Sequence, residues 1–433
     1  MKWAKPVVDN LKIRGNWGSL GNGNVSPYSY LETMSIGTTS TIFDGGFTSF
    51  VGMPSIVPDS LTWEKVQTWD IGLDMDLLHS RLSVSADYYI RNTKDLYSSG
   101  PELPAMLGAA TPKGNYGELK TRGWEVTLAW RDAFKLAGKD FTYSVKGSLW
   151  DSRTWVTKFY SETQSLYGLY EGMELGDIWG FRTDGLFMSN EEAAAWYPDR
   201  YHNLITSTVP FAGDVKFLDI DNNKEITAGA GTVEDHGDLD RIGNIMPRYQ
   251  YGINLDAKWN GIGLSLFFQG VGHRDWYPAD DSGMFWGGYG RAYDYSLKNQ
   301  ADVVILDKST ENWTVTNPGA YWPRRLYGPA FEANGQGTMD APNDYFLQNA
   351  AYLRLKNITL EYTLPSKLTK KLSIDKVRIY FSGENLLTFT PLSKHAPMFD
   401  PEGLGTDTDY NGAREGAVYP MLKTYTFGLN LTF

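Results

Sequence analysis

The sequence predicts an all-β fold, an antiparallel transmembrane β-barrel of which about ten strands lie in this chain, with long loops at one end. Three observations predict it. Apolar and polar residues alternate with a period of two in one segment after another. Aromatic residues make up 14% of the chain, and they recur near the ends of these segments, as at a bilayer interface. The connections alternate between short and long.

The strands follow from this alternation in chain order. In 69–77, Trp69, Ile71 and Leu73 share one face, whereas Asp70 and Asp74 share the other. A strand of this kind is half apolar and half polar. The ten expected strands are 11–17, 69–77, 82–91, 124–131, 141–149, 249–259, 262–269, 353–364, 377–382 and 421–433.

The connections fall into two classes. Short ones are expected at 78–81, 132–139, 260–261 and 365–374, and long ones at roughly 18–62, 96–115, 159–247, 273–350 and 390–420. Because the classes alternate, every long loop falls at the same end of an up-and-down sheet. In the strand 353–364 the apolar phase shifts after Leu355, which predicts a β-bulge near Lys356–Asn357.

A soluble antiparallel sheet shows the same alternation, so strand length distinguishes the two. Sandwich strands average about 5–6 residues, whereas transmembrane strands need about 9–11, and several segments here keep phase for nine or more. The face opposite the aromatic residues carries charges, so it has to line a wet lumen. The aromatic residues near strand ends are Trp69, Trp124, Trp130, Tyr249, Trp259, Tyr362, Phe389, Tyr425 and Phe433.

Composition excludes several functions. There is no cysteine, so a disulfide or a thiolate nucleophile is impossible. The net charge of -11 argues against nucleic-acid binding, which needs a basic surface. The five His form no metal-ligand spacing, and no GxSxG, P-loop or dinucleotide fingerprint occurs. We therefore expect no catalytic residues and no enzymatic activity. The sequence contains no run of about 18 apolar residues, so no transmembrane helix is predicted. No signal peptide is recognised after Met1.

Seven stretches resemble a known family. The chain is similar to the C-terminal part of SusC/RagA-like TonB-dependent outer-membrane transporters of Bacteroidetes, and the likeness covers nearly all of 1–433. The matching stretches are "LKIRGNWGSLGN" at 11–22, "LTWEKVQTWDIGLDMDLLHSRLSVSADYYIRNTKDLY" at 61–97, "NYGELKTRGWEVTLAWRD" at 115–132, "GDIWGFRTDGLF" at 176–187, "YLRLKNITLEYTLP" at 352–365, "VRIYFSGENLLTFT" at 377–390 and "YPMLKTYTFGLNLTF" at 419–433.

The resemblance implies a larger, 22-stranded barrel in the cell outer membrane, with extracellular loops and an N-terminal plug. It implies TonB-dependent import of glycan oligosaccharides or peptides, together with a SusD-like lipoprotein. The ten strands correspond to the last ten, and the signal peptide, TonB box and plug are absent from this chain. We therefore expect a fragment, or a piece that another chain completes. A passive porin, a surface adhesin, a soluble binding protein and a non-functional fragment are the alternatives.

An acidic stretch, "DIDNNKEITAG" at 219–229, is the best candidate for an ion site. Asp219, Asp221 and Asn223 alternate, and Glu225 follows at the next such position, as oxygen donors do in calcium loops. The family resemblance adds Asp240, in "DR" at 240–241. Lys224 departs from the family's glycine. The alternative is an Asx-rich turn whose side chains bond backbone amides. If an ion binds at 219–240, we expect structural Ca²⁺ or Mg²⁺.

Aromatic and charged residues gather in the long loop 273–350. Rings beside guanidinium groups suit recognition of a sugar or a peptide. Contact with a lid protein and packing inside the loop are the alternatives. The candidate ligand-binding residues are Trp276, Tyr277, Trp286, Tyr289, Arg291, Trp322, Arg324 and Arg325.

The last segment, 421–433, ends on an aromatic residue. Tyr425, Phe427 and Phe433 would face outer-membrane lipid. By resemblance, outer-membrane barrels finish on such a strand, and their insertion machinery reads the terminal aromatic. We therefore expect these three residues to form an assembly signal.

Overall fold

The computed structural model describes most of the chain. The described residues are 7–23, 28–58, 61–101, 104, 106, 108, 111–196, 211–278, 285, 301–324, 342–404 and 419–433. Within them, no helix is long and apolar enough to cross a membrane.

Ten antiparallel strands form one sheet, and the all-β prediction is confirmed. Their order in the sheet is their order in the chain, with β1 and β20 at its two edges. All ten coincide with expected strands, although several extend further at the loop end. The strands are β1 (Val8–Asn22), β4 (Glu64–Leu77), β5 (Leu82–Ser99), β6 (Lys113–Leu136), β7 (Lys139–Lys158), β12 (Arg248–Trp259), β13 (Ile262–His273), β18 (Tyr352–Thr363), β19 (Lys376–Phe389) and β20 (Thr424–Thr432).

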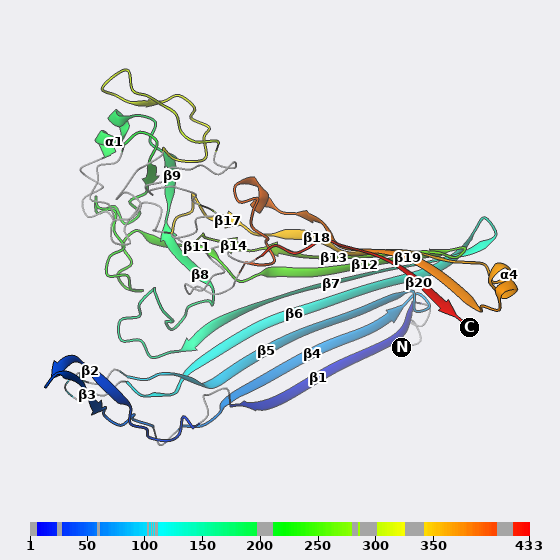
Figure 1. Cartoon of the computed structure of the whole chain (residues 1–433), viewed down its shortest axis with the longest axis horizontal. Helices are drawn as coiled ribbons and strands as arrows, with labels where there is room; N and C mark the ends of the chain where they lie inside the picture. The colour runs from blue at the N-terminus through cyan, green and yellow to red at the C-terminus, as the bar shows by residue number, and fades with distance from the viewer. Residues whose placement is uncertain are drawn as a thin grey trace.

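The sheet is curved, and its connections sort by length as predicted (Figure 1). Tight turns join β4 to β5, β6 to β7 and β12 to β13 at one end, where β1 begins and β20 ends. The connection from β18 to β19 at that end contains a short helix, α4 (Ser366–Thr369), and a 3₁₀ turn, η3 (Lys370–Leu372). The loops at the other end carry the remaining elements.

The strand register pairs apolar residues with apolar residues and polar residues with polar residues, so rows of each kind run across the sheet. One row of paired residues on the outward face runs Ile13, Leu73, Ala86, Val126, Leu149 and Tyr251. The next row, on the inward face, runs Lys12, Asp74, Ser85, Thr127, Ser148, Gly252, Gln269, Arg354 and Thr388. The outward face therefore suits lipid and the inward face a wet lumen.

The apolar band has the height that a bilayer requires. On β4 it runs from Trp69 to Leu77, about 26 Å along the strand, and this stretch of nine residues matches the about 9–11 residues that a tilted transmembrane strand needs. At its outer edge Trp17 and Trp69 lie side by side, with ring centroids 6.1 Å apart. Both rings are exposed.

The inward face uses glycines as seats for tyrosine rings. The Tyr380 ring lies where a Cβ on Gly428 would be, and the Tyr89 ring does the same at Gly123. Each pair joins neighbouring strands, β19 to β20 and β5 to β6. These positions need glycine because a ring of the adjacent strand fills the space of a side chain.

The predicted β-bulge is confirmed. Phe267 pairs with Asn357 and Phe268 with Leu355, so Lys356 is the extra residue in β18. The bulge restores the apolar phase. Arg354 and Lys356 therefore face inward on one side of it, while Ile358 and the apolar residues after it still face outward.

The long loops pack into a compact loop domain beside the end of the sheet (Figure 1). Its core is aromatic and aliphatic, and includes Phe181, Phe187, Phe217, Trp276 and Trp322. Its elements are β8 (Asp177–Phe181), β9 (Thr183–Leu186), α1 (Asn190–Trp196), β10 (Val215–Phe217), β11 (Leu239–Asn244), β14 (Asp275–Trp276), β15 (Leu306–Asp307), β16 (Thr314–Val315), β17 (Gln348–Asn349) and η4 (Pro391–Lys394). A separate hairpin, β2 (Ile36–Phe43) with β3 (Gly46–Val51), lies in the first loop.

Candidate functional site at the loop end of the sheet

A buried ion cluster joins the loop domain to the inward face. Arg354, only 3% exposed, donates from Nη2 to Asp400 Oδ1 at 2.6 Å and from Nη1 to Glu402 Oε2 at 2.7 Å. Its Nε donates to Thr388 Oγ1 at 2.9 Å. Lys356 Nζ adds a contact of 2.8 Å to Glu402 Oε1. Two cations of β18 thus hold two carboxylates of the segment that follows η4.

The backbone reinforces this cluster. The amides of Glu402 and Met421 donate to the Asp400 carboxylate at 3.0 and 2.9 Å. Burial alone would raise the pKa of Asp400, but the hydrogen bonds from Arg354 and the two amides outweigh it and hold this pKa below its usual value. Asp400 is therefore ionised at neutral pH.

Arg274 holds the same segment through carbonyl groups. Its guanidinium is buried and donates to Ile245 O at 3.1 Å, Pro401 O at 3.3 Å and Leu404 O at 2.7 Å. Burial lowers the pKa of Arg274 to about 10, which leaves it charged at neutral pH. The segment 391–404 is thus tied to β13 and β18 by two buried arginines.

Three of the predicted ligand-binding residues lie in the loop-domain core. Trp276 and Trp322 are 0% exposed and Tyr277 is buried. Both tryptophans pack on Phe285, with ring centroids 6.0 and 5.2 Å away, and Asn343 Nδ2 donates to Tyr277 Oη at 3.1 Å. In this structure these rings pack against other rings, which is the alternative that the sequence left open.

Arg324 is engaged within the protein as well. It forms a two-point ion pair with buried Asp214, at 2.7 and 2.9 Å, and its guanidinium lies 4.9 Å from the Phe211 ring centroid. The other four candidates lie outside the described residues: Trp286, Tyr289, Arg291 and Arg325.

The acidic loop brings three carboxylates together. Single oxygens of Asp219, Asp221 and Asp238 lie within 4.8 Å of one another. Asp238 is fully buried and accepts from the amides of Ile220 at 2.7 Å and Thr227 at 2.9 Å. Burial raises the pKa of Asp238 despite these hydrogen bonds. Carboxylate oxygens in this arrangement suit a hard cation.

The remaining predicted ion ligands are used differently. Asn223 Oδ1 accepts from the Glu225 amide at 2.6 Å, and its Nδ2 donates to Asp221 Oδ2 at 3.0 Å, so it forms the expected Asx turn. Neither Asn223 nor Glu225 belongs to the three-carboxylate cluster.

Asp240, expected from the family motif, is not in the cluster either, because it accepts from Arg182 Nε at 2.8 Å. Asp238 takes its place, two residues earlier, in the turn that precedes β11. The sequence shows carboxylates at both 238 and 240, but which of the two joins the cluster depends on which one is buried in the folded loop.

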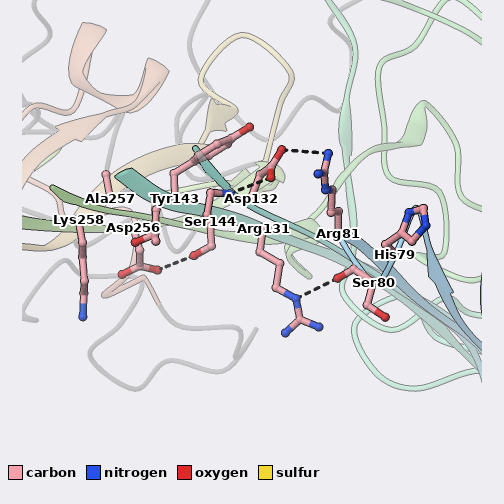
Figure 2. A pocket seen from close by; sticks show the side chains of 12 residues that line it. His79, Ser80, Arg81, Arg131, Asp132, Tyr143, Ser144, Asp256, Ala257 and Lys258 are labelled. Atoms are coloured by element: carbon pink, nitrogen blue, oxygen red, sulfur yellow. Dashed lines mark hydrogen bonds and ion pairs between the residues drawn. The ribbon is translucent and has the colours of Figure 1, made fainter. Parts of the chain in front are cut away.

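A groove of about 670 Å³ lies at the opposite, short-turn end (Figure 2). Ser144 Oγ donates to Asp256 Oδ2 at 3.3 Å, and Arg131 Nε donates to the Ser80 carbonyl at 3.0 Å. Arg81 Nη1 lies 3.5 Å from Asp132 Oδ2. Sequence analysis did not single out this groove, because three segments that are far apart in the chain line it: the turn 79–81, the β6–β7 hairpin and the end of β12.

The expected lipid-facing residues of the last strand are exposed. Phe427 is 81% and Tyr425 60% exposed, and Phe381 of β19 lies 5.0 Å from the Phe427 ring. Phe433, just beyond β20, is exposed too.

Comparisons with known proteins agree with the barrel architecture. Residues 2–182 match the family described as "TonB dependent receptor-like, beta-barrel". TonB-dependent receptor P3 of Formosa agariphila is 27% identical over 99% of this chain and 40% of its own length. TonB-dependent receptor SusC of Bacteroides thetaiotaomicron is 25% identical over 99% of this chain and 38% of its length. The chain thus spans about two fifths of these relatives.

Solved structures show the same fold. A structure of the RagAB peptide transporter superposes with a TM-score of 0.65 at 20% identity, over 99% of this chain and 41% of that chain. The RagAB peptide importer in its closed-closed state gives 0.67 at 19% identity, with the same coverage. The relatives are named as receptors and transporters, in line with the expectation of a protein that is not an enzyme.

Proposed function

We propose that this chain forms part of the wall of a nutrient importer in the bacterial outer membrane, because residues 2–182 match a TonB-dependent receptor barrel family and nearly the whole chain is similar to TonB-dependent receptors. The observation that carries the proposal is the two-sided sheet. Its outward face is apolar over the height of a bilayer, and its inward face is lined by hydrogen-bonded polar side chains. Polar solutes could pass along such a wall.

The loop domain supports import of a selected solute. Two buried arginines tie the segment 391–404 to β13 and β18, so the domain is fixed to the sheet at the extracellular end. A porin needs only an open pore, whereas a receptor needs a shaped mouth. This favours an importer over a passive porin or an adhesin.

We propose oligomeric nutrients, either peptides or glycan oligosaccharides, as the substrates. RagAB is named as a peptide transporter, and this supports the peptide choice. The described loop aromatics do not distinguish the two, since Trp276 and Trp322 are buried. By the same likeness we propose a SusD-like lipoprotein and the TonB complex as partners.

Uptake by cells tests this proposal. Cells that express the receptor containing this chain, and matched deletion cells, are given fluorescent peptides or oligosaccharides of several lengths. Import is expected only with the receptor, and it should stop when an uncoupler removes the proton-motive force. Uptake that persists in the presence of the uncoupler would show a passive pore, and surface binding without uptake would show an adhesin. Affinity purification of the receptor would test for the lipoprotein.

Two further sequence expectations stay proposals. We propose that the outward face of β20, with Tyr425, Phe427 and Phe433, serves as an assembly signal, which its exposure supports. We also propose a structural Ca²⁺ or Mg²⁺ in the 219–240 loop. Its ligands would be Asp219, Asp221 and Asp238, whose convergence supports it.

A further inference from the structure

The outward face changes character just beyond the aromatic belt of β1 and β4. The row that contains Trp17, Trp69 and Ile90 continues across the sheet into Arg122 and Arg153. The row beyond it contains Gln67, Asn92, Lys120 and Trp155, and Lys65 and Lys94 pair in the row after that. Basic side chains thus cluster on the outward face of β4–β7. We call Lys65, Lys94, Lys120, Arg122 and Arg153 the basic patch.

The patch stands out against the charge of the molecule. The chain carries a net charge of -11, and the inward face of β4 presents Asp70, Asp74 and Asp76. On β4 the carboxylates face inward, whereas the basic residues that gather beyond the aromatic belt of β4–β7 face outward. A local surface rich in one sign of charge attracts a partner of the other sign.

Two members of the patch have carboxylate partners. Lys65 Nζ lies 3.0 Å from Asp95 Oδ2, and Arg153 Nε donates to buried Glu174 Oε1 at 2.6 Å. Within the described part of the chain, Lys94, Lys120 and Arg122 have no carboxylate at ion-pair distance. Glu118 also lies on β6, two residues before Lys120.

Trp155 organises the two arginines. The Arg153 guanidinium lies 5.2 Å and that of Arg122 5.8 Å from the Trp155 ring centroid, both within cation–π range. Glu174 fixes Arg153 because the 172–175 segment bonds to the edge of β7, with Leu175 N donating to Thr154 O at 2.8 Å. The guanidinium groups are thereby held in place at the height of the membrane interface.

We propose that the basic patch binds the phosphate group of an anionic lipid in the outer leaflet of the outer membrane. Neighbouring strands lie about 4.8 Å apart, so Arg122 and Arg153 can contact one phosphate together, and arginine pairs well with phosphate. Trp17 and Trp69 mark the depth at which lipid headgroups begin. The proposal rests on the outer-membrane location of the chain and is independent of the nutrient that the protein imports.

The test compares two triple variants of the receptor purified from outer membranes. Lys94→Gln/Lys120→Gln/Arg122→Gln removes three charges from the patch. Lys12→Gln/Arg91→Gln/Lys146→Gln removes three exposed charges from the inward face of the same sheet. Equal outer-membrane levels and equal heat-modifiable gel mobility establish that both variants fold.

Native mass spectrometry then measures binding of dimyristoylphosphatidylglycerol and of the matched phosphatidylcholine in neutral micelles. The unmodified receptor and the inward-face variant should prefer the anionic lipid, and the patch variant should bind it roughly a hundredfold more weakly. Inorganic phosphate at the lipid concentration should not compete. Equal lipid affinity of the two variants would overturn the proposal. Full displacement by inorganic phosphate would overturn it as well, because it would show a site for a soluble anion.

Discussion

Replacing Arg354 with Met should release the segment 391–404 from the sheet. Arg354 is 3% exposed and carries two carboxylate contacts, 2.6 Å to Asp400 and 2.7 Å to Glu402. Methionine keeps much of the side-chain volume but leaves buried carboxylates without their partner.

The magnitude follows from the remaining contacts. Breaking a buried ion pair by removing one partner costs about 3–5 kcal/mol. Lys356 still lies 2.8 Å from Glu402, so only Asp400 is left without a cation, and the lower figure applies. A loss of about 3 kcal/mol corresponds to roughly a hundredfold change in the opening equilibrium.

Hydrogen exchange measures this opening directly. The amides of Glu402 and Met421 both donate to Asp400, so they should exchange roughly a hundredfold faster in the Arg354→Met protein. The double variant Arg354→Met/Asp400→Asn removes the uncompensated charge and keeps the Lys356–Glu402 pair, so it should recover most of the protection. Unchanged exchange in the single variant would refute the reasoning, as would equal protection loss in the double variant.

Acid gives a second reading of the same cluster. The pKa of Asp400 is lowered in the folded protein, so the opened segment binds protons more tightly than the closed one. The stabilisation is present above the unfolded pKa of about 3.9 and is lost as pH falls through the lower folded value. In the Arg354→Met protein the largest contribution that lowers the pKa of Asp400 is gone, so acid should protonate the buried carboxylate and favour the closed segment, and the acid-induced opening at this site should disappear.

Four further outcomes are expected. Gly428→Ala places a Cβ in the Tyr380 ring and should lower the yield of folded protein in the outer membrane. Adding Tyr380→Ala to the same chain should restore that yield. An unrestored yield in the double variant would contradict the idea that Gly428 makes room for the Tyr380 ring. Burial and Lys394 lower the pKa of His395, and its ring stacks on Tyr321 with the ring centroids 3.4 Å apart. Hydrogen-exchange protection of the amides around His395 should therefore fall as pH drops below about 6.5. His395→Phe should abolish this pH dependence. Terbium luminescence should report an ion bound at 219–240, and the signal should be lost in Asp238→Asn but kept in Asp240→Asn. Equal signals from the two variants would contradict the assignment of Asp238 as an ion ligand. Phe433→Asp should impair outer-membrane assembly, and normal surface levels would refute that role.

The sheet could be predicted from the sequence because each strand carries the alternation of apolar and polar residues within its own few residues. Alternation is local, so 69–77 or 249–259 identifies a strand and its two faces without any knowledge of its neighbours. The bulge at Lys356 was visible for the same reason, as a change of phase within one strand. Strand ends were less certain, and β6 runs over Lys113–Leu136 where 124–131 was expected.

The loop domain could not be predicted because its contacts are between distant segments. Trp276 belongs to a segment with the composition of a binding surface, yet its ring packs on Phe399, which lies in the loop after β19, with ring centroids 4.8 Å apart. Whether an aromatic ring is exposed depends on such long-range packing. The choice of Asp238 over Asp240 has the same origin, since Arg182, far away in sequence, takes up Asp240.

The bulge in β18 also sets which changes of length the strand tolerates. Side chains alternate between lipid and lumen, so removing one residue inverts every side chain on one side of the deletion. Deleting Lys356 itself would only remove the bulge, with Arg354 still inward and Leu355 and Ile358 still outward, and would lose the Lys356–Glu402 contact. Deleting Thr359 would instead turn Glu361 toward the hydrocarbon. Deleting or inserting two residues keeps the parity and shifts only the height. Length variation among relatives of this strand should therefore occur in steps of two, or as the loss of the one bulged residue at position 356.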